Sequence, residues 1–300
     1  MMLAWIVWPN RFPYFTNATW ACITAIDDPD IRFIVHWNYS FNGTAGKYDV
    51  ISYEFPLTEK VRTLLRLEDL FARMALFTEH EHSMGHHAAL ITLFEILEVI
   101  SRADLKSDLL QELERQKRVL SSLHNNPAIS EQALEAILAE IEQASALLLA
   151  MTGKIGQHLR ENEWLMGIKQ RAVMPGGTCE FDLPSYHYWQ AQNANLRREN
   201  LRAWLAPLLP LHTALKIVLR LLRENGKVFH FTAHQGTFQQ MQGGRVAHML
   251  RLRLNNGLAC IPEVGANKYA INIRFIAANY AAKSTLFEQD VPFELTFCSL

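Results

Sequence analysis

Hydrophobic side chains recur every three to four positions through much of the first half of the chain, which is the period of an amphipathic helix. This pattern predicts four helices, over residues 56–77, 86–101, 104–124 and 130–148. Pro56 suits the first turn of the first helix, and Ser130 is a good N-cap for the fourth. Because the connections between these stretches are short, we expect antiparallel neighbours packed into a helical assembly.

After about residue 175 the pattern changes. The turn signal Pro175-Gly176-Gly177 is followed by a predicted short strand at residues 178–181, and two helical stretches come next, near 195–206 and 210–224. Apolar and polar positions then alternate with the period of a strand in residues 228–232, 247–254, 269–275 and 293–297. The sequence therefore predicts an α+β fold, with an N-terminal mostly helical domain over residues 50–175 and an antiparallel β domain over residues 176–300 that also holds two or three helices.

Residues 1–49 differ from both of these parts. They hold most of the tryptophan and show no helical period, although residues 31–37 fit a strand. The first eight residues are apolar, but they lack a basic segment and end at Pro9, so they are too short for a signal sequence or a membrane span. From this pattern we predict a protein that is neither exported nor inserted in a membrane.

The overall composition is that of a globular protein with a large core, because 49% of the 300 residues are hydrophobic and 20% are charged. The formal net charge of -1 gives no overall basic field that would attract nucleic acid or anionic lipid, so a basic site has to be a local patch. The four cysteines are widely spaced, which fits a reducing cytosol and predicts neither a zinc knuckle nor a redox motif. They are Cys22, Cys179, Cys260 and Cys298.

No motif in the sequence points to catalysis. The densest histidine cluster, residues 79–82 with His86 and His87, lacks the spacing of a helix-borne zinc site, and we interpret it as a polar loop between helices. The glycines form neither a dinucleotide-binding nor a phosphate-binding loop, and no serine or cysteine stands in a recognisable nucleophile context. We therefore predict no metal, no cofactor and no catalytic residue. A hydrolase without a recognisable motif stays a hypothesis for the function, ranked behind the two that are given below.

The arginines carry more information. Arg62, Arg66 and Arg73 have the spacing of one helix face, opposite the apolar face that includes Val61 and Leu64. Arginine binds carboxylates through paired hydrogen bonds, so such a face is suited to an acidic partner. A solvated face with no specific partner has the same spacing, and the pattern leaves both interpretations open. A second basic group comprises Arg160, Lys169 and Arg171.

Several ordered stretches of the chain resemble the ZapD family of cell division proteins. The most specific are IGQHLRE at residues 155–161, PGG at 175–177, FDLP at 181–184 and HYW at 187–189. The likeness also includes residues 55–68 and 109–116, which resemble helices of the family, and the strand-like residues 250–252 and 273–275. It runs from about residue 51 to the C-terminus. Residues 1–49 have no counterpart in the family. We therefore expect them to be an artefact of the gene model, in which translation is assigned to start upstream of the natural start at Val50.

The resemblance implies a function in division. Proteins of this family bind the flexible C-terminal tail of FtsZ, the tubulin-like division protein, and bundle its filaments. The chain is therefore expected to be a cytoplasmic homodimer at the mid-cell division ring that promotes Z-ring assembly, and not an enzyme. Carried over position by position, the expected tail-binding residues are Arg66, Arg102, Arg160 and His187, with Lys169 and Arg171 as secondary ones. Glu163 stands where some relatives carry a basic residue, which makes this part of the pocket less positive.

The main alternative is a regulator that binds nucleic acid with the same arginines. The near-zero net charge and the lack of a helix-turn-helix or an RNA-binding signature argue against this alternative. We therefore predict FtsZ as the partner, with no nucleic acid and no membrane.

Overall fold

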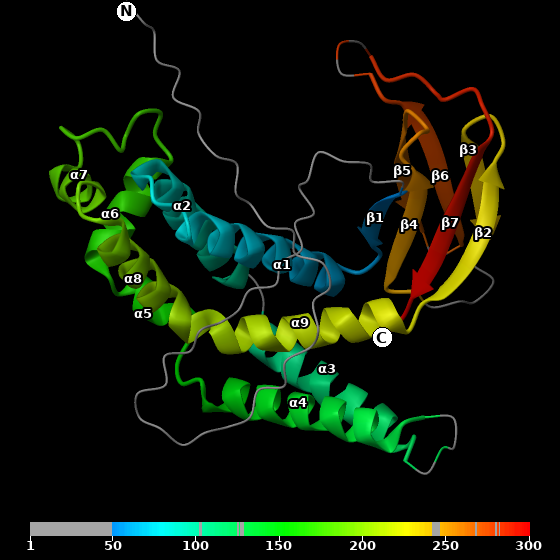
Figure 1. Cartoon of the computed structure of the whole chain (residues 1–300), viewed down its shortest axis with the longest axis horizontal. Helices are drawn as coiled ribbons and strands as arrows, with labels where there is room; N and C mark the ends of the chain where they lie inside the picture. Colours follow the sequence, from blue (N-terminus) through cyan, green and yellow to red (C-terminus); the bar gives the residue numbers. More distant parts are fainter. Residues whose placement is uncertain are drawn as a thin grey trace, which may run out of the picture. The chain divides into compact units, whose positions relative to one another are not determined.

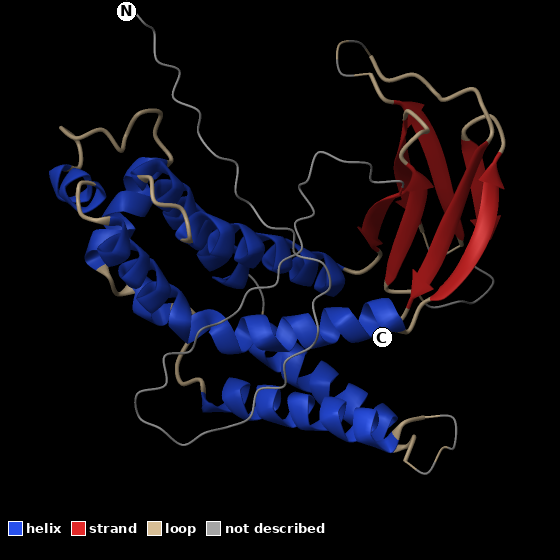
Figure 2. Cartoon of the chain, viewed as in Figure 1, coloured by secondary structure: helices blue, strands red, loops and turns tan. Residues whose placement is uncertain are grey.

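The computed structural model describes residues 50–300, except residues 102–103, 125, 127–128, 242–246, 268, 280 and 282. The strand predicted at residues 31–37 lies outside the described residues, as does Arg102. In the described part, one strand precedes a long run of helices, and antiparallel strands follow (Figures 1 and 2). This arrangement confirms the predicted α+β class.

The helices lie between the first strand and the other strands along the chain. Strand β1 (Val50–Pro56) is followed by the helices α1 (Glu59–Thr78), α2 (Ser83–Ser101), α3 (Leu105–Ser121), α4 (Glu131–Ala150), α5 (Gln157–Arg160), α6 (Glu163–Ala172), α7 (Pro184–Gln190), α8 (Ala194–Leu205), the 3₁₀ helix η1 (Ala206–Leu208) and α9 (Leu209–Glu224). The remaining strands are β2 (Lys227–Ala233), β3 (Thr237–Met241), β4 (Met249–Asn255), β5 (Cys260–Ala266), β6 (Ala270–Ala277) and β7 (Val291–Cys298).

Helix α1 follows directly from its local sequence. The side chain of Thr58 accepts a hydrogen bond from the backbone N–H of Val61 at 3.3 Å and so caps the helix, which begins at Glu59. Its buried residues recur at three-to-four spacing, which turns one apolar face toward the core. Pro56, predicted in the first turn of this helix, instead ends strand β1 opposite Met249. Proline fits there because β1 is an edge strand.

Two antiparallel sheets form the β layer. The larger sheet has the strand order β1-β4-β7-β2, and the smaller one has the order β3-β6-β5. Strand β1 pairs with β4, with Tyr53 opposite Leu252, although all the helices lie between these two strands in the sequence. The inner faces of the two sheets enclose an apolar core that includes Leu252, Ile273 and Phe293.

The strand predicted at residues 178–181 is wrong, because these residues form turns between α6 and α7. The backbone N–H of Cys179 donates to the carbonyl of Gly176 at 3.1 Å, and the N–H of Leu183 donates to the carbonyl of Cys179 at 3.0 Å. These short-range bonds satisfy the backbone groups that a strand would present to a neighbour. The segment is therefore a compact loop.

The helices share a second core, in which α9 packs against α1, α3 and α4. Helices α8 and α9 belong to this core although they follow residue 175, and β1 joins the larger sheet although it precedes that residue. The division of the chain at residue 175 stays a prediction.

Cys260 and Cys298 are buried, while Cys179 is exposed.

An arginine joins the helical core to the larger sheet. Arg223, at the end of α9, donates to both carboxylate oxygens of Glu54 in β1, at 2.8 and 2.9 Å. It also donates to both carboxylate oxygens of Glu68 in α1, at 2.8 and 2.6 Å. Burial by itself lowers the pKa of Arg223, but the hydrogen bonds that it donates to Glu68 and Glu54 outweigh burial, so the pKa is raised. The charged form of Arg223 thus links β1, α1 and α9.

Two helical stretches, Ser83–Ser101 and Ala194–Glu224, are long and apolar enough to cross a membrane by length and composition alone. In the fold, 50% of the first apolar window and 61% of the second are buried within the protein. Such burial is what the core helices of a globular protein show.

Candidate functional site

The turn before α5 fixes the position of Arg160, the last residue of that helix. Gly153 and Gly156 have φ angles of 71° and 74°, in the left-handed region that glycine adopts without strain. A β-carbon on Gly156 would lie 2.6 Å from Cδ1 of Leu97 and 2.9 Å from Cδ1 of Ile100, which both belong to α2. The turn therefore packs directly on the end of α2, and only glycine permits that approach.

A pocket of about 530 Å³ opens beside this turn, at the end of α2 and the start of α3. We call it the basic pocket, because three of its lining residues are cations and one is a carboxylate. The lining residues are Ile100, Ser101, Asp104, Leu105, Lys106, Gly153, Lys154, Ile155 and Arg160.

The cations of the basic pocket bond mainly to backbone groups. Nζ of Lys106 donates to the carbonyl of Met151 at 2.6 Å and so closes the C-terminal end of α4. Nη1 of Arg160 donates to the carbonyl of Ile155 at 2.8 Å. Among the described residues, neither of these cations nor Lys154 forms an ion pair with a carboxylate. The pocket therefore keeps positive charge available for an anionic ligand.

One other predicted binding residue, Lys169, contacts α2, which ends at this pocket. Lys169 of α6 forms an ion pair with Glu98, one turn before Ser101 at the pocket wall. Arg102 follows Ser101 directly in the chain but lies outside the described residues. The structure thus places Arg160 in the pocket, whereas Lys169 does not line it and is paired with Glu98.

Arg171 lies in the last turn of α6, and His187 lies in α7. Arg171 is 3.8 Å from a carboxylate oxygen of Asp182, and Nε2 of His187 is 3.6 Å from a carboxylate oxygen of Glu180. Both acids belong to the loop between α6 and α7. Neither basic residue lines the basic pocket.

Arg66 occupies a third place, on the exposed face of α1. The prediction that Arg62, Arg66 and Arg73 share one exposed face is confirmed. Glu59 accepts a hydrogen bond from Nε of Arg62 at 3.0 Å and lies 3.9 Å from Nη1 of Arg66. Arg73 pairs with Asp69 at 2.6 Å. These arginines therefore neutralise acids of their own helix, and Arg66 does not line the basic pocket.

Sequence reasoning did not identify Lys106 and Lys154, which line the basic pocket with Arg160. The signal available for Lys154 was its place between Gly153 and Gly156, since two glycines around a lysine mark a tight turn that exposes it. Lys106 carried no such signal. Its position depends on the packing of α3 against the end of α4.

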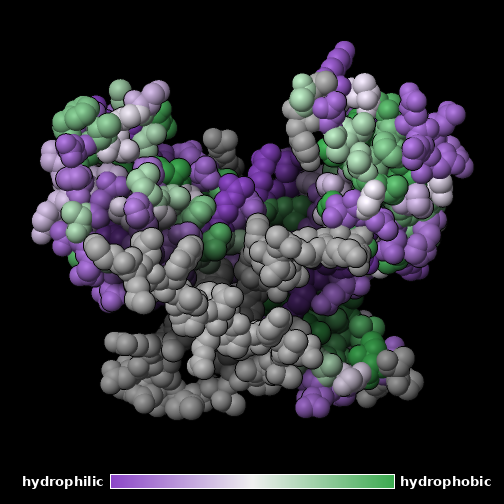
Figure 3. Space-filling view, turned by 45° about the horizontal axis from the view of Figure 1, so that its top comes forward, coloured by the Kyte–Doolittle hydropathy of each residue, from purple (hydrophilic) through white to green (hydrophobic). Residues whose placement is uncertain are grey.

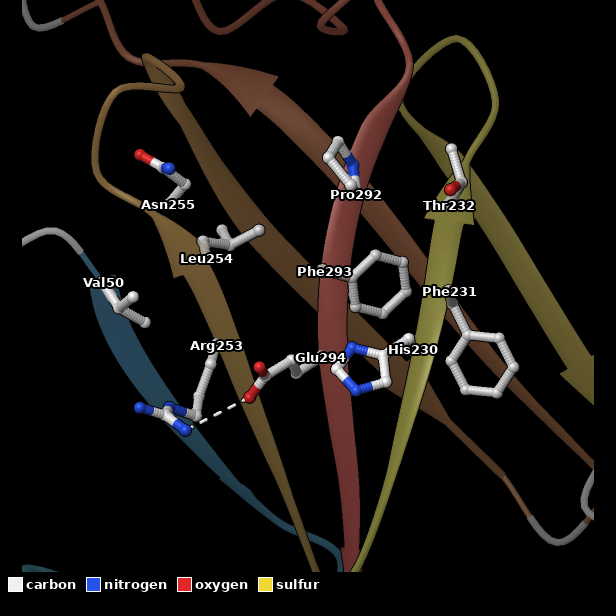
Figure 4. Close-up of a pocket in the computed structure, with 10 residues that line it drawn as sticks. All are labelled: Val50, His230, Phe231, Thr232, Arg253, Leu254, Asn255, Pro292, Phe293 and Glu294. Atoms are coloured by element: carbon white, nitrogen blue, oxygen red, sulfur yellow. Dashed lines mark hydrogen bonds and ion pairs between the residues drawn. The ribbon is translucent and has the colours of Figure 1, made fainter.

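A second hollow of about 430 Å³ lies on the outer face of the larger sheet. Figure 4 shows Arg253 of β4 and Glu294 of β7 pointing toward each other across it, 3.2 Å apart. His230 of β2 is directly opposite Glu294 in the sheet register. Because its arginine and glutamate charges neutralise each other, this hollow offers less attraction to an acidic ligand than the basic pocket does.

The histidine cluster is divided between a loop and a helix. The prediction of a polar loop at residues 79–82 is confirmed, because α1 ends at Thr78 and α2 begins at Ser83. His86 is buried in α2, where Nδ1 accepts a hydrogen bond from Nε of Arg197 at 2.8 Å and Nε2 lies 3.2 Å from the carbonyl of Thr78. Burial, followed by the charge of Arg197, lowers the pKa of His86. This histidine therefore holds α2 and α8 together as a neutral ring.

Comparison with known proteins gives a consistent result. The family model of ZapD, described as a cell division protein, matches residues 65–274. A cell division protein ZapD from Aromatoleum aromaticum is 58% identical over 251 residues, which are 84% of this chain and 98% of the relative.

Two further relatives carry the same name. The protein from Azoarcus sp. (strain BH72) is 57% identical over 251 residues, or 84% of this chain and 100% of the relative. The protein from Chromobacterium violaceum is 56% identical over 250 residues, or 83% of this chain and 99% of the relative.

Proposed function

Since the chain belongs to the ZapD family of cell division proteins, we propose that it binds the C-terminal tail of FtsZ through the basic pocket, bundles FtsZ filaments and promotes Z-ring assembly. The observation that carries the proposal is the charge of this pocket. Lys106, Lys154 and Arg160 face it with one carboxylate, Asp104, and none of the three is engaged in an ion pair among the described residues.

The chemistry of these residues suits an acidic peptide. Arg160 uses one N–H for the carbonyl of Ile155, which leaves further guanidinium N–H groups for a carboxylate of the tail. Lys154 adds a point charge that tolerates several ligand positions. A disordered tail loses entropy when it binds, so each contact is expected to have moderate affinity.

A homodimer would convert such moderate contacts into bundling. Two copies of the basic pocket can hold tails from two filaments, and each filament offers many tails, so avidity strengthens the assembly. The protein would act in the cytoplasm, at the mid-cell division ring. Monomeric variants that keep normal affinity for the tail peptide are then expected to decorate FtsZ filaments without bundling them in electron micrographs.

The direct test measures binding of a fluorescent FtsZ-tail peptide by anisotropy. Reversing two pocket charges, in the variant Lys154→Glu with Arg160→Glu, is expected to weaken binding at least tenfold at 0.05 M salt, because like charges would face an acidic tail. The difference should shrink at 0.5 M salt, where screening is stronger. Arg73→Glu is the matched control, because Arg73 is exposed on α1 and lies outside the pocket.

Two results would contradict this assignment. Unchanged affinity in the folded double variant would remove the pocket from the site. A loss confined to Arg66→Glu would place the tail on the exposed face of α1 instead. A DNA mobility-shift assay at the same salt concentration serves as the arm for the nucleic-acid alternative, and binding of DNA with similar affinity would argue against a tail-specific site.

A further inference from the structure

Gly167 stands in the middle of α6 with open space above it. No atom lies within 4 Å of the position that a β-carbon on Gly167 would take. A glycine inside a helix is less favourable than an alanine, because it loses more backbone entropy on folding. At Gly156 the close approach of α2 explains the glycine, but among the described residues no neighbour explains Gly167. The backbone at Gly167 is therefore accessible to the chain of a binding partner.

The loop after α6 exposes large apolar side chains. Val173 is 82% exposed and Phe181 is 80% exposed, and Met174 and Tyr188 are exposed as well. Tyr188 belongs to α7, and we call these four residues together the apolar loop. Figure 3 shows green, hydrophobic surface among purple on the lobe that carries the outer ends of the helices, at the left. So large an apolar exposure at one end of a fold is typical of an interaction surface.

Two polar side-chain contacts, at 3.8 and 3.6 Å, connect parts of this segment. The pair between Arg171 and Asp182 brings Val173 and Met174 toward Phe181, which precedes Asp182 in the chain. The pair between His187 and Glu180 brings Phe181 toward Tyr188 in the same way. Two binding residues that the sequence predicted, Arg171 and His187, therefore lie close in the chain to these exposed apolar side chains.

Helix α6 separates the basic pocket from the apolar loop. Arg160 precedes its first residue, Glu163, and Val173 follows its last residue, Ala172. Its ten residues span about 15 Å. An extended peptide covers that distance with about five residues at ~3.3 Å each.

We propose that the exposed face of α6, open at Gly167, is the track along which the FtsZ tail passes from the basic pocket to the apolar loop. The inference rests on the proposed function and adds the chemistry and spacing of the ligand. Acidic residues of the tail lie at Arg160, apolar residues lie against Phe181, and about five residues join them. Charge complementarity at the pocket and the position of α6 between the pocket and the apolar loop favour one peptide over a second copy of the chain or a lipid surface.

The first experiment uses Gly167→Ala. The added methyl group meets no atom of the protein, so the variant is expected to melt about 2 °C higher than the wild type. It should nevertheless bind the FtsZ-tail peptide at least threefold more weakly, because the methyl group stands in the track. Gly265→Ala is the matched control, since Gly265 is equally open but lies in β5. A structural role alone predicts equal or better binding in the stabilised variant.

The second experiment uses Phe181→Ser. Loss of a large apolar contact is expected to weaken peptide binding about tenfold, and by the same factor at 0.05 and 0.5 M salt, because salt does not screen apolar contacts. Met241→Ser is the control, since Met241 is 69% exposed on β3, outside the track. Shorter peptides that keep the acidic residues but lack the apolar ones should bind Phe181→Ser and wild type equally.

The outcomes separate the two proposals. If wild type does not bind the tail peptide, the proposed function fails. If Arg160→Glu loses binding while Gly167→Ala and Phe181→Ser bind as wild type, the pocket stands and the track is refuted. The track is also refuted if Phe181→Ser leaves the peptide affinity unchanged but changes one of two other properties. A change in the molar mass of the protein by light scattering would mean that a second copy covers the apolar loop. A change in its sedimentation with anionic lipid vesicles would mean that a membrane covers it.

Discussion

The dependence of stability on pH is expected to change when His212 is replaced by leucine. The ring of His212, in α9, packs against Phe71 of α1 with centroids 4.6 Å apart, and the residue is buried. Burial, with a smaller contribution from the charge of Lys216, lowers the pKa of His212 from 6.5 to about 3. The folded protein therefore keeps this ring neutral at pH values where the unfolded chain binds a proton.

The sign and size of the effect follow from this difference. Above pH 6.5 the ring is neutral in both states, so the stability that depends on its neutrality is fully present. As the pH falls below 6.5, the unfolded chain gains a proton that the folded protein does not, and stability is lost until the pH reaches about 3. Each pH step of one costs about 1.4 kcal/mol, so the loss between pH 6.5 and pH 5 is about 2 kcal/mol.

Urea titrations at pH 7, 6 and 5, followed by circular dichroism, measure the free energy of unfolding in wild type and in His212→Leu. The wild type is expected to lose about 2 kcal/mol more than the variant between pH 7 and pH 5. His86 and His248, whose pKa values are also lowered, are present in both proteins and cancel in the comparison. His234→Leu is the control, because that side chain is 81% exposed. Equal pH slopes for wild type and His212→Leu would refute the reasoning.

Three further predictions concern the joint, the pocket and the N-terminal residues. Arg223→Met removes the cation that Glu54 of the larger sheet and Glu68 of α1 share, so it should lower the free energy of unfolding by about 2 kcal/mol in the same urea assay. Replacing both glutamates by glutamine in this variant should restore part of the loss. Gly156→Ala places a methyl group against side chains of α2 at a left-handed backbone position, so the melting temperature and the tail-peptide affinity should both fall. An unchanged melting curve would argue against the close packing. Deleting residues 1–49 should leave the melting temperature and FtsZ bundling nearly unchanged, as measured by calorimetry and sedimentation.

Local periodicity was enough to predict the elements whose side chains face a single core. The first four predicted helices correspond to α1 to α4, and the strand-like stretches near residues 228–232, 247–254, 269–275 and 293–297 correspond to β2, β4, β6 and β7. In each of these elements the spacing of apolar residues is set by its own geometry, with a period of 3.6 or 2, so it can be read without knowing the neighbours. The caps at Thr58 and Ser130 are equally local.

Other elements depended on partners distant in the sequence. β1 was not predicted, because its strand conformation comes from pairing with β4, about two hundred residues later, and Pro56 is as suitable for the end of an edge strand as for a helix start. Residues 178–181 were assigned to a strand, but no neighbouring strand is available among the described residues, and the backbone closes into turns.

The candidate site shows the same division. Among the binding residues that the family resemblance predicted, Arg160 lines the basic pocket and Lys169 does not, and the spacing on α1 correctly placed Arg66 on an exposed face. Only the tertiary structure showed that Arg66 shares Glu59 with Arg62, that Lys106 and Lys154 join Arg160, and that Gly167 has open space above it. A charge pattern along the chain gives the side of a helix on which a residue lies. Whether its charge is neutralised, and which distant residues share its pocket, depends on the packing of elements that are far apart in the sequence.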